Sequence, residues 1–366
     1  MLARIAIALW LAGSVTAPLL AQGADIGARI AARTIIGSGV QAVGADSFAA
    51  VKADFPDGVT AYPDLTYQTL PGYRPLKLDL FLPPKSFASR GPRPLIVYVH
   101  GGGWMAGGPR RSAAYVDWPA VLASLAAEGY VVASVSYRFS REAPFPAAIQ
   151  DVKAAIRWLR ARSSSYHVDP ARAAIWGQSA GGHLAALAGV SCNVAALEPG
   201  ARIVPRTANV ETVASTAAGS DQASDCVQAV VGWFGIYDFA TMPKRTSPPP
   251  GMPPGPSAEN LFLGCPADNC TPAQRAFASP ITYIDHADPP FLLMHGSDDH
   301  TVPESQTEQF AAALTAAGVP VRKIVMPGSD HSWIGKTPEA TRATSQTALR
   351  EAIDFIEQHI GDRRQK

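Results

Sequence analysis

The chain has little charge and almost no excess of either sign. Only 17% of its 366 residues are charged, and 31 Lys and Arg nearly balance 30 Asp and Glu. Nucleic-acid binding normally needs a clustered basic surface, so the sequence predicts no nucleic-acid partner. Hydrophobic residues make up 47% of the chain, which excludes a disordered chain and suffices for one sizeable core. The length fits one large α/β domain with extensions.

The N-terminus lacks a full membrane span. Arg4 precedes an apolar run at residues 5–12, and small residues follow that run. A span needs about 20 apolar residues, and Pro18 interrupts the end of this run. The pattern is typical of a secretory signal peptide over residues 1–24, with a membrane anchor as the alternative. We therefore expect an exported protein, periplasmic or secreted, with no stable membrane span after processing.

Cysteine is scarce, and its spacing excludes a zinc site. There is no CxxC pair and no histidine at ligand spacing, so no metal site is predicted. An even number in an exported chain suggests two disulfides, and four free buried thiols are the alternative. One pair is close enough to close a small loop, which leaves the other two to pair. The pairs are Cys265 with Cys270 and Cys192 with Cys226.

The first regular pattern begins after an extension at residues 25–63. That extension is rich in Ala and Gly, shows no strong strand signal and is predicted to be partly helical around residues 26–42. Polar and apolar residues then alternate at 65–70 and 76–81, on either side of a Pro-Gly turn. Such alternation predicts an antiparallel hairpin at a sheet edge.

Six further strands are predicted. The runs at 95–99, 131–135, 173–176 and 291–294 are nearly continuous apolar, which is typical of strands buried on both faces, and two more strand candidates complete the set. These two candidates lie at residues 229–233 and 321–326. Helical patterns lie between or after the six strands at residues 118–128, 146–162, 183–190, 304–317 and 341–360. Alternating strands and helices predict an α/β fold with a mostly parallel central sheet flanked by helices.

One segment interrupts this alternation. Residues 242–256 contain seven prolines and two glycines, a density that argues against regular structure. We interpret residues 241–280 as a lid-like, Cys-containing insertion over the carboxyl edge of the sheet, where ligands of α/β proteins bind. A plain solvent loop is the alternative.

A serine lies at the turn between a predicted strand and a predicted helix. Ser179 has Gly177 and Gly181 on either side, in a Gly-x-Ser-x-Gly pattern directly after the strand 173–176. Small neighbours allow the close approach that such a strained turn needs. The turn would expose the hydroxyl at a helix N-terminus, whose amide dipoles favour negative charge. Ser179 is therefore the predicted nucleophile; a structural serine needs none of this context.

Three consecutive glycines, Gly101, Gly102 and Gly103, follow the strand 95–99. Glycines leave backbone N–H groups unobstructed, which stabilising a tetrahedral oxyanion requires. The amide of Ala180, directly after the nucleophile, would supply another donor. The alternatives are a flexible turn or a phosphate loop, and the absence of a following Gly-Lys-Ser/Thr excludes the P-loop.

A serine hydroxyl needs a base, and the base needs an orienting carboxylate. After this kind of turn they follow in the order Ser, Asp or Glu, His. Asp298 and Asp299 follow the strand 291–294, and His331 lies on the loop after the strand 321–326. His331 is the predicted base, while strand geometry alone does not choose between the aspartates. The other histidines are interpreted as structural or surface residues: His100, His167, His183, His286, His295, His300 and His359.

These motifs resemble those of the bacterial HGGG-type esterases, the hormone-sensitive-lipase and feruloyl-esterase-like branch of the α/β hydrolases. The resemblance rests on residues 100–104, 136–148, 177–181, 233–239 and 295–303. It implies an α/β-hydrolase catalytic domain at residues 64–362. The Pro-rich segment and the four cysteines depart from the family pattern and leave the substrate pocket open.

The resemblance implies acyl transfer without a cofactor or a metal. Ser179 attacks an ester carbonyl, His331 takes its proton, and the triad acid aligns with Asp299, four places after His295. Water then hydrolyses the acyl-enzyme. The expected protein is a serine carboxylesterase whose small-molecule substrate is a short-chain ester or an aryl- or carbohydrate-linked one.

Aromatic residues next to these motifs are candidates for lining an apolar pocket, although core packing explains any of them equally well. They are Trp104, Trp233, Tyr237 and Trp333.

Three other functions remain open. An amidase, such as an arylformamidase-like enzyme, uses the same loop and triad. A peptidase of this fold would need room for a propeller domain. A non-catalytic binding protein on the hydrolase fold usually loses part of the triad.

Overall fold

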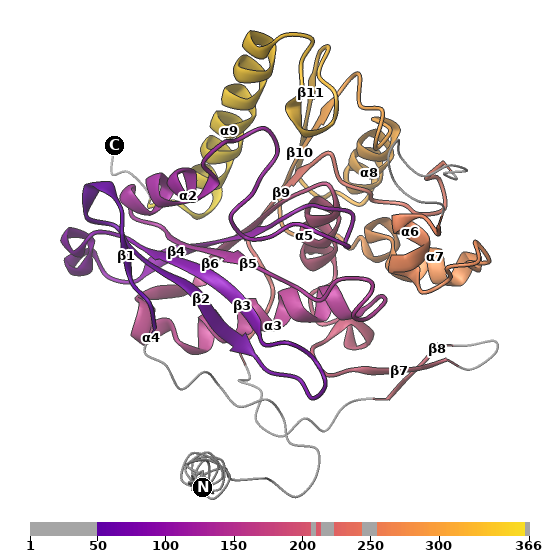
Figure 1. Ribbon diagram of the computed structural model, residues 1–366, viewed down its shortest axis with the longest axis horizontal. Coiled ribbons are helices and arrows are strands. Elements are labelled where there is room, and N and C mark those ends of the chain that lie inside the picture. The colour runs from indigo at the N-terminus through magenta and orange to yellow at the C-terminus, as the bar shows by residue number, and fades with distance from the viewer. Residues whose placement is uncertain (1–49, 206–209, 214–222, 244–254, 363–366) are drawn as a thin grey trace, which may run out of the picture.

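The computed structural model describes residues 50–205, 210–213, 223–243 and 255–362. Their main feature is a nine-stranded sheet in the order β1-β2-β3-β5-β4-β6-β9-β10-β11, beside a two-stranded hairpin, β7-β8. From β5 to β11 the strands of the large sheet are parallel, and β1, β2 and β3 add an antiparallel edge (Figure 1). The strands are β1 (Ala53–Asp54), β2 (Thr60–Gln68), β3 (Leu76–Leu82), β4 (Arg93–Val99), β5 (Val131–Val135), β6 (Val168–Gln178), β7 (Arg202–Pro205), β8 (Val210–Val213), β9 (Ala229–Trp233), β10 (Phe291–Gly296) and β11 (Val321–Met326).

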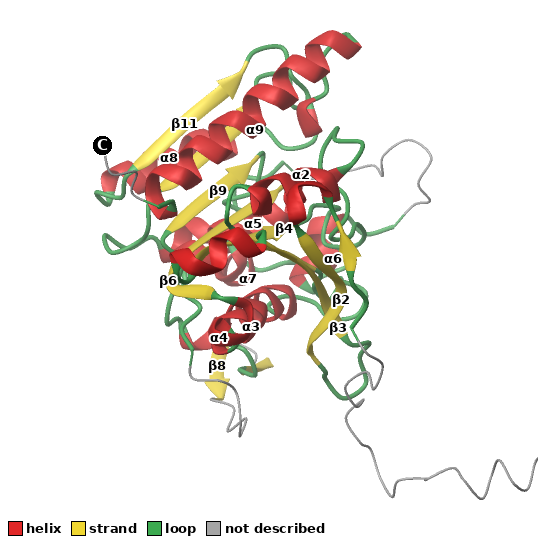
Figure 2. Ribbon diagram, turned by 90° about the vertical axis from the view of Figure 1, so that its left-hand side faces the viewer, coloured by secondary structure: helices red, strands yellow, loops and turns green. Residues whose placement is uncertain are grey.

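Helices cover both faces of this sheet (Figures 1 and 2). Side chains of α3, α5 and α8 join the core cluster on one face, and side chains of α2 and α9 join the cluster on the other. The helices are α2 (Trp118–Ala127), α3 (Ala147–Ala161), α4 (Ser163–Tyr166), α5 (Ala180–Val190), α6 (Ala258–Leu263), α7 (Pro272–Ala278), α8 (Ser305–Ala316) and α9 (Pro338–Ile360). Short 3₁₀ turns are η1 (Pro56–Gly58), η2 (Lys85–Arg90), η3 (Ala195–Leu197), η4 (Pro280–Tyr283) and η5 (His331–Trp333).

The central strands are apolar over the stretches in which both of their faces are buried. In β4, Leu95, Val97 and Val99 belong to the cluster under α3, α5 and α8, while Ile96 and Tyr98 belong to the opposite cluster. Successive strand residues point to opposite sides, so a strand between two helical layers needs apolar residues at every position. The predicted α/β fold and its six core strands are confirmed.

The expectation that residues 25–63 hold no strand is wrong at its C-terminal end. β1 lies within this stretch, and β2 begins at Thr60. Pro63 hides the strand in the sequence, because proline cannot donate to a ladder. It is tolerated here because β1 pairs with β2 only through Thr60 and Ala61, and the pairing of β2 with β3 shifts register between Tyr62 and Leu65, so neither neighbouring strand pairs with Pro63. The predicted helix at 26–42 and the signal peptide at 1–24 lie outside the described residues.

The insertion also contains more regular structure than its proline content predicts. α6 and α7 lie between residues 241 and 280, and the described part of the Pro-rich stretch ends just before α6. Ser257 caps α6 through the amide of Asn260, and Thr271 forms a capping box with Gln274 at α7. These caps accept hydrogen bonds from free backbone N–H groups at the helix N-termini. Two short helices therefore form beside prolines that cannot continue a helix.

Both predicted disulfides form. Cys192 pairs with Cys226 across 34 positions of the sequence, and Cys265 pairs with Cys270 across 5. The first joins the end of α5 to the segment that enters β9, and the second closes a loop between α6 and α7. Within the described ranges, no helix combines the length and apolar character needed to cross a bilayer.

Candidate active site

Ser179 occupies a strained turn between β6 and α5. Its φ and ψ are 52° and −121°, outside the regions that non-glycine residues ordinarily adopt. A Cβ atom at Gly177 would collide with the carbonyl of Gly181, and one at Gly181 would collide with the carbonyl of Val99. The glycines therefore permit the close approach of strand and helix that exposes the serine, as predicted for this turn.

The glycine loop lies directly against this turn. A Cβ atom at Gly101 would stand 3.2 Å from Cβ of Ser179 and 2.9 Å from the carbonyl oxygen of Gln178. Gly102 and Gly103 have φ values of 119° and 60°, which glycine adopts without strain. Gly101 thus borders the Ser179 side chain, Gly102 and Gly103 continue the loop from there, and Ala180 follows the serine at the start of α5.

His100 holds the start of this loop. Its Nδ1–H donates to the carbonyl of Gly101 at 2.7 Å, and its ring stacks on Tyr137 with centroids 4.6 Å apart. The Tyr137 hydroxyl donates in turn to the carbonyl of His100 at 3.0 Å. Burial lowers the pKa of His100 to about 4, so the ring is neutral near pH 7. The structural interpretation of His100 is thereby refined: it fixes the glycine loop.

Ser179, His331 and Asp299 form a continuous hydrogen-bonded chain. The Ser179 hydroxyl lies 3.0 Å from Nε2 of His331, and Nδ1 of His331 lies 2.8 Å from Oδ2 of Asp299. A proton on Nδ1 leaves Nε2 free to accept from the serine, which is the tautomer a general base needs. The three side chains come from the turns after β6, β11 and β10, so the sheet brings together residues up to 152 positions apart.

Asp299 is a buried carboxylate with four nearby donors. Its Oδ1 accepts hydrogen bonds of 2.8 Å from the amides of Thr301 and Val302, and its Oδ2 faces His331 and His295. Burial alone would raise the pKa of this carboxyl. Hydrogen bonds from His295, His331 and Val302 outweigh that effect and hold the pKa below its ordinary value. Asp299 is therefore an anion that can orient the His331 ring.

Asp298 takes no part in this chain. Its carboxylate accepts from the Ser297 hydroxyl at 2.9 Å, and its amide donates to the carbonyl of Ser329 at 3.0 Å. The two adjacent aspartates thus point to different partners, and Asp299 alone is within hydrogen-bond distance of His331.

His295 contributes more to the site than its interpretation as a structural histidine predicts. It is fully buried, with Nε2 3.3 Å from Oδ2 of Asp299 and 2.8 Å from the carbonyl of Val302. Its Nδ1 lies 2.7 Å from the Thr307 hydroxyl on α8. His295 thereby ties the acid to a rigid helix. The sequence signal was present, since His295 opens the segment that carries Asp299.

The four candidate pocket aromatics lie in the hydrophobic core. Trp104, Trp233, Tyr237 and Trp333 are each at most 1% exposed. Trp104 stacks on Phe262 at 4.3 Å, Tyr237 stacks on Phe310 at 4.6 Å, and Trp233 packs edge-on against Trp333 at 5.4 Å. Each ring is thus occupied by other core rings. This arrangement favours core packing beneath the site over the pocket-lining role.

A chain of contacts connects the glycine loop to the insertion. The Trp104 indole donates to Nδ1 of His183 at 3.2 Å, and Nε2–H of His183 donates to the carbonyl of Ala278 in α7 at 2.8 Å. Burial lowers the pKa of His183 to about 4, which keeps Nδ1 free to accept from Trp104. With the stacking of Phe262 on Trp104, these contacts anchor both insertion helices beside the site.

The described residues contain no group of three or more His, Cys, Asp or Glu side chains that could hold a metal ion. The donor chemistry of the site is that of a hydroxyl, an imidazole, a carboxylate and backbone amides.

Comparison with known proteins finds a matching family model and relatives that are named esterases. The family model BD-FAE matches residues 78–314. The chain belongs to the BD-FAE family. Among curated proteins it is similar to Esterase LipQ of Mycobacterium tuberculosis, with 32% identity over 72% of this chain and 55% of that protein. It is also similar to Esterase LipC of the same organism, with 34% identity over 66% of this chain and 53% of that protein. The chain thus spans about half the length of these relatives.

Solved structures agree with the sequence relatives. A truncated form of a carbohydrate esterase from gut microbiota superposes with a TM-score of 0.63 at 27% identity, covering 83% of this chain and 98% of that one. A bifunctional GH43-CE protein of Bacteroides eggerthii gives a TM-score of 0.63 at 31% identity, covering 83% of this chain and 36% of that one. The predicted α/β-hydrolase fold and the resemblance to the feruloyl-esterase-like branch are therefore confirmed.

Proposed function

We propose that the protein is a serine carboxylic ester hydrolase with Ser179, His331 and Asp299 as its triad. The observation that carries the proposal is the hydrogen-bonded chain from the Ser179 hydroxyl through both nitrogens of His331 to Asp299. It stands on a strained turn beside a glycine loop, the arrangement that nucleophilic acyl transfer needs. Membership of the BD-FAE family and the similarity to named esterases support the same activity.

The reaction follows from these positions. The Ser179 oxygen attacks the ester carbonyl carbon while Nε2 of His331 takes the hydroxyl proton, and Asp299 stabilises the imidazolium. The amides of Gly101, Gly102, Gly103 and Ala180 are available to stabilise the oxyanion. When the tetrahedral intermediate collapses, His331 returns the proton to the leaving alcohol. Water then attacks the acyl-enzyme with His331 as base, and the carboxylic acid leaves from Ser179.

The substrate class we infer is an ester attached to a carbohydrate, with a short acyl or an aryl acid. Two solved relatives above 25% identity support this class, since their titles describe a carbohydrate esterase and a GH43-CE protein. A short acid also suits a site whose neighbouring aromatic rings are already packed against one another.

A substrate panel tests this function. The panel contains 4-nitrophenyl acetate, 4-nitrophenyl decanoate, methyl ferulate, acetylated xylan and 4-nitroacetanilide. We expect kcat/KM for the acetate ester to exceed that for the anilide by at least about 10³, and xylan to release acetate. Equal or faster turnover of the anilide would instead identify an amidase, and no turnover of any ester would contradict the proposal.

We also propose that the protein is exported after removal of the N-terminal segment, because that segment has the pattern of a signal peptide. N-terminal sequencing of protein secreted by an expressing cell measures the cut. Recovery of the intact chain from the cytoplasm would contradict export.

A further inference from the structure

A pocket of about 550 Å³ lies at the edge of the sheet opposite the triad. Its walls include Arg93, the first residue of β4, and His167, which precedes β6. Ser179 follows the other end of β6, and all eleven residues of that strand separate it from His167. At about 3.3 Å per strand residue this is on the order of 30 Å. The pocket therefore cannot hold the group that Ser179 attacks.

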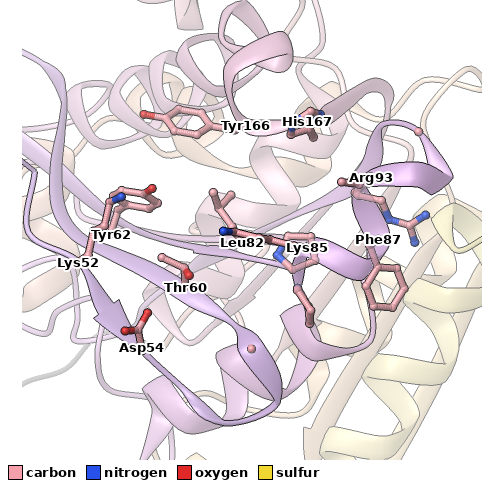
Figure 3. Close-up of a pocket in the computed structure, with 15 residues that line it drawn as sticks. Lys52, Asp54, Thr60, Tyr62, Leu82, Lys85, Phe87, Arg93, Tyr166 and His167 are labelled. Atoms are coloured by element: carbon pink, nitrogen blue, oxygen red, sulfur yellow. The ribbon is translucent and has the colours of Figure 1, made fainter.

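Three segments of chain build this pocket. They are residues 52–62 at the start of the sheet edge, residues 82–93 between β3 and β4, and the turn at Tyr166 and His167. Figure 3 shows Tyr166 and His167 across the pocket from Thr60 and Asp54. Lys52 and Tyr62 lie at one end, and Phe87 and Arg93 lie at the other. The volume falls within the range of about 300 to 1,000 Å³ that small-molecule sites occupy.

Three aromatic rings give the pocket apolar faces. Tyr62, Phe87 and Tyr166 line it, and each side chain is only partly buried. Trp158 supports Tyr166 with ring centroids 5.8 Å apart, and the Arg93 guanidinium lies 5.1 Å from the Phe87 ring. The Lys52 ammonium, also in the pocket lining, lies 5.6 Å from the Tyr62 ring. Each ring thus has at least one packing neighbour and remains partly exposed. Rigid aromatic faces of this kind bind ligands at low entropic cost.

The polar groups around these rings are of both signs. Lys85, Asp54, Thr60 and His167 line the pocket, and within the described residues their side chains make no hydrogen bond or ion pair. Arg93 is different, because it already donates to the carbonyl of Gly129 and pairs with Asp362 at 2.7 Å. The pocket therefore offers uncommitted donors and an uncommitted carboxylate acceptor close to aromatic faces.

This combination selects one ligand chemistry. A ligand with a single charge would pair with only one of Lys85 and Asp54 and meet the like charge of the other, and a purely apolar ligand would desolvate both without compensation. A sugar ring has a face of C–H groups that packs on an aromatic ring, and hydroxyls on its rim that both donate and accept. We propose that this pocket binds a stretch of neutral polysaccharide chain. The inference rests on the proposed function in one respect: the chain bound here is the one that carries the ester.

The pocket and the triad act together on one polysaccharide chain. Holding an unreacted part of a polysaccharide on the far edge of the sheet keeps further ester groups at high local concentration near Ser179. The pocket should therefore lower KM for a polymeric ester and leave the hydrolysis of a small soluble ester unchanged.

The test measures binding and catalysis separately in the full chain. Binding of xylohexaose is titrated by calorimetry in Ser179→Ala protein, which cannot consume an ester. Adding Tyr166→Ala should weaken binding by about tenfold or more, which corresponds to about 1.4 kcal/mol. Tyr166→Phe keeps the ring and should bind within about twofold of the parent. Tyr283→Ala, which removes a partly buried tyrosine outside the pocket, is the matched control.

Catalysis is then compared with Ser179 intact. Tyr166→Ala should raise KM for acetylated xylan several-fold and leave kcat/KM for 4-nitrophenyl acetate within about twofold. Xylohexaose binding that is absent, or that is equal in Tyr166→Ala and its parent, would overturn the pocket proposal. Tighter binding of polygalacturonate than of xylohexaose would also overturn it. If no ester is hydrolysed but Tyr166→Ala still abolishes xylohexaose binding, the proposed function fails and the pocket stands.

Discussion

The two edges of the parallel sheet use their polar groups in opposite ways. At the carboxyl edge, Ser179, His331 and Asp299 are bonded to one another, and Asp299 accepts two further amide hydrogen bonds. At the amino edge, Lys85 and Asp54 line a pocket and have no polar partner among the described residues. A catalytic group must be oriented before the substrate arrives. A recognition group keeps its hydrogen-bonding capacity for the ligand.

Glycines at the two edges also differ in how much space surrounds them. Gly181 is required by space, because a Cβ atom there would collide with the backbone of Val99. Gly91 is required only by its φ of 80°, since a Cβ atom there would meet nothing within 4 Å. The turn at Ser179 is thus crowded and strained, whereas the turn at Gly91 is open. Substitutions at the first should change chemistry, and substitutions at the second should change binding.

Ser179→Ala gives the largest expected effect. Removing the nucleophile should lower kcat for 4-nitrophenyl acetate by up to about a millionfold, as for triad serines generally. Circular dichroism and melting temperature should remain those of the parent, because alanine fits wherever serine does. Binding of xylohexaose at the amino edge should be unaffected. Retained ester hydrolysis by the purified variant would exclude Ser179 as the nucleophile.

Asp299→Asn and Asp298→Asn separate the two adjacent acids. Asparagine at 299 keeps the shape but favours the wrong His331 tautomer, which should cost about 10⁴ in kcat by analogy with other triads. Asparagine at 298 keeps an oxygen that can accept from the Ser297 hydroxyl and should change kcat by less than about tenfold. Steady-state kinetics of both variants decides between them. The larger loss at 298 would mean that the observed geometry is not the working one.

The two disulfides lie at different edges and should matter differently. Cys192–Cys226 joins the far end of α5 to the entry of β9 at the amino edge, whereas Cys265–Cys270 lies in the insertion. Loop-closure entropy predicts losses of about 4 and about 2 kcal/mol, respectively, for the paired Cys→Ser variants. Urea unfolding measures both. We expect the Cys192/Cys226 variant to lose more stability and the Cys265/Cys270 variant to lose more kcat/KM. The opposite order in both measurements would contradict the different roles assigned to the two disulfides.

The last expected effect concerns acid stability and appears only below neutral pH. Burial lowers the pKa of His183 to about 4 in the folded protein, below about 6.5 in the unfolded chain. The unfolded chain therefore binds a proton first as pH falls. The stability that neutral His183 contributes is complete above pH 6.5 and is lost as pH falls towards 4, by up to about 3 kcal/mol.

His183→Gln removes this titration, so melting temperature should fall less steeply between pH 6.5 and 4 in the variant. His286→Gln is the control, because the side chain of His286 is 87% exposed. Equal slopes in His183→Gln and the parent protein would show that His183 is not buried as a neutral ring.

The sequence predicts most of the sheet because runs of apolar residues mark most of its strands. Residues 131–135 and 229–233 are buried on both faces, and these strands form at the predicted bounds, as does the edge strand at 321–326. The Ser179 turn is equally easy to predict, because a side chain at either neighbouring glycine would collide with the backbone. By contrast, β2 begins at Thr60 although Pro63 interrupts its pattern, since strand pairing outweighs a local signal.

Other parts of the structure depend on tertiary packing, which the spacing of residues in the sequence does not reveal. The prolines of the insertion obscured α7, although the Thr271 and Gln274 capping box was present in the sequence. Trp333 lies two positions from His331, yet its side chain points into the core. His295 lies beside Asp299 because β10 and the following loop fold back on each other. Neighbouring positions in sequence thus do not reveal which side chains face the substrate.

Labelling with an alkyl fluorophosphonate tests the central claim, that Ser179 is the nucleophile of acyl transfer, most directly. The reagent forms a stable adduct with a serine only where a base activates the hydroxyl and an oxyanion site stabilises the attack. We expect one adduct per chain on the peptide that contains Ser179, with ester hydrolysis lost in proportion. Asp299→Asn should be labelled far more slowly, and Asp298→Asn at nearly the parent rate. An adduct on another residue, or full activity in protein labelled at Ser179, would contradict the account.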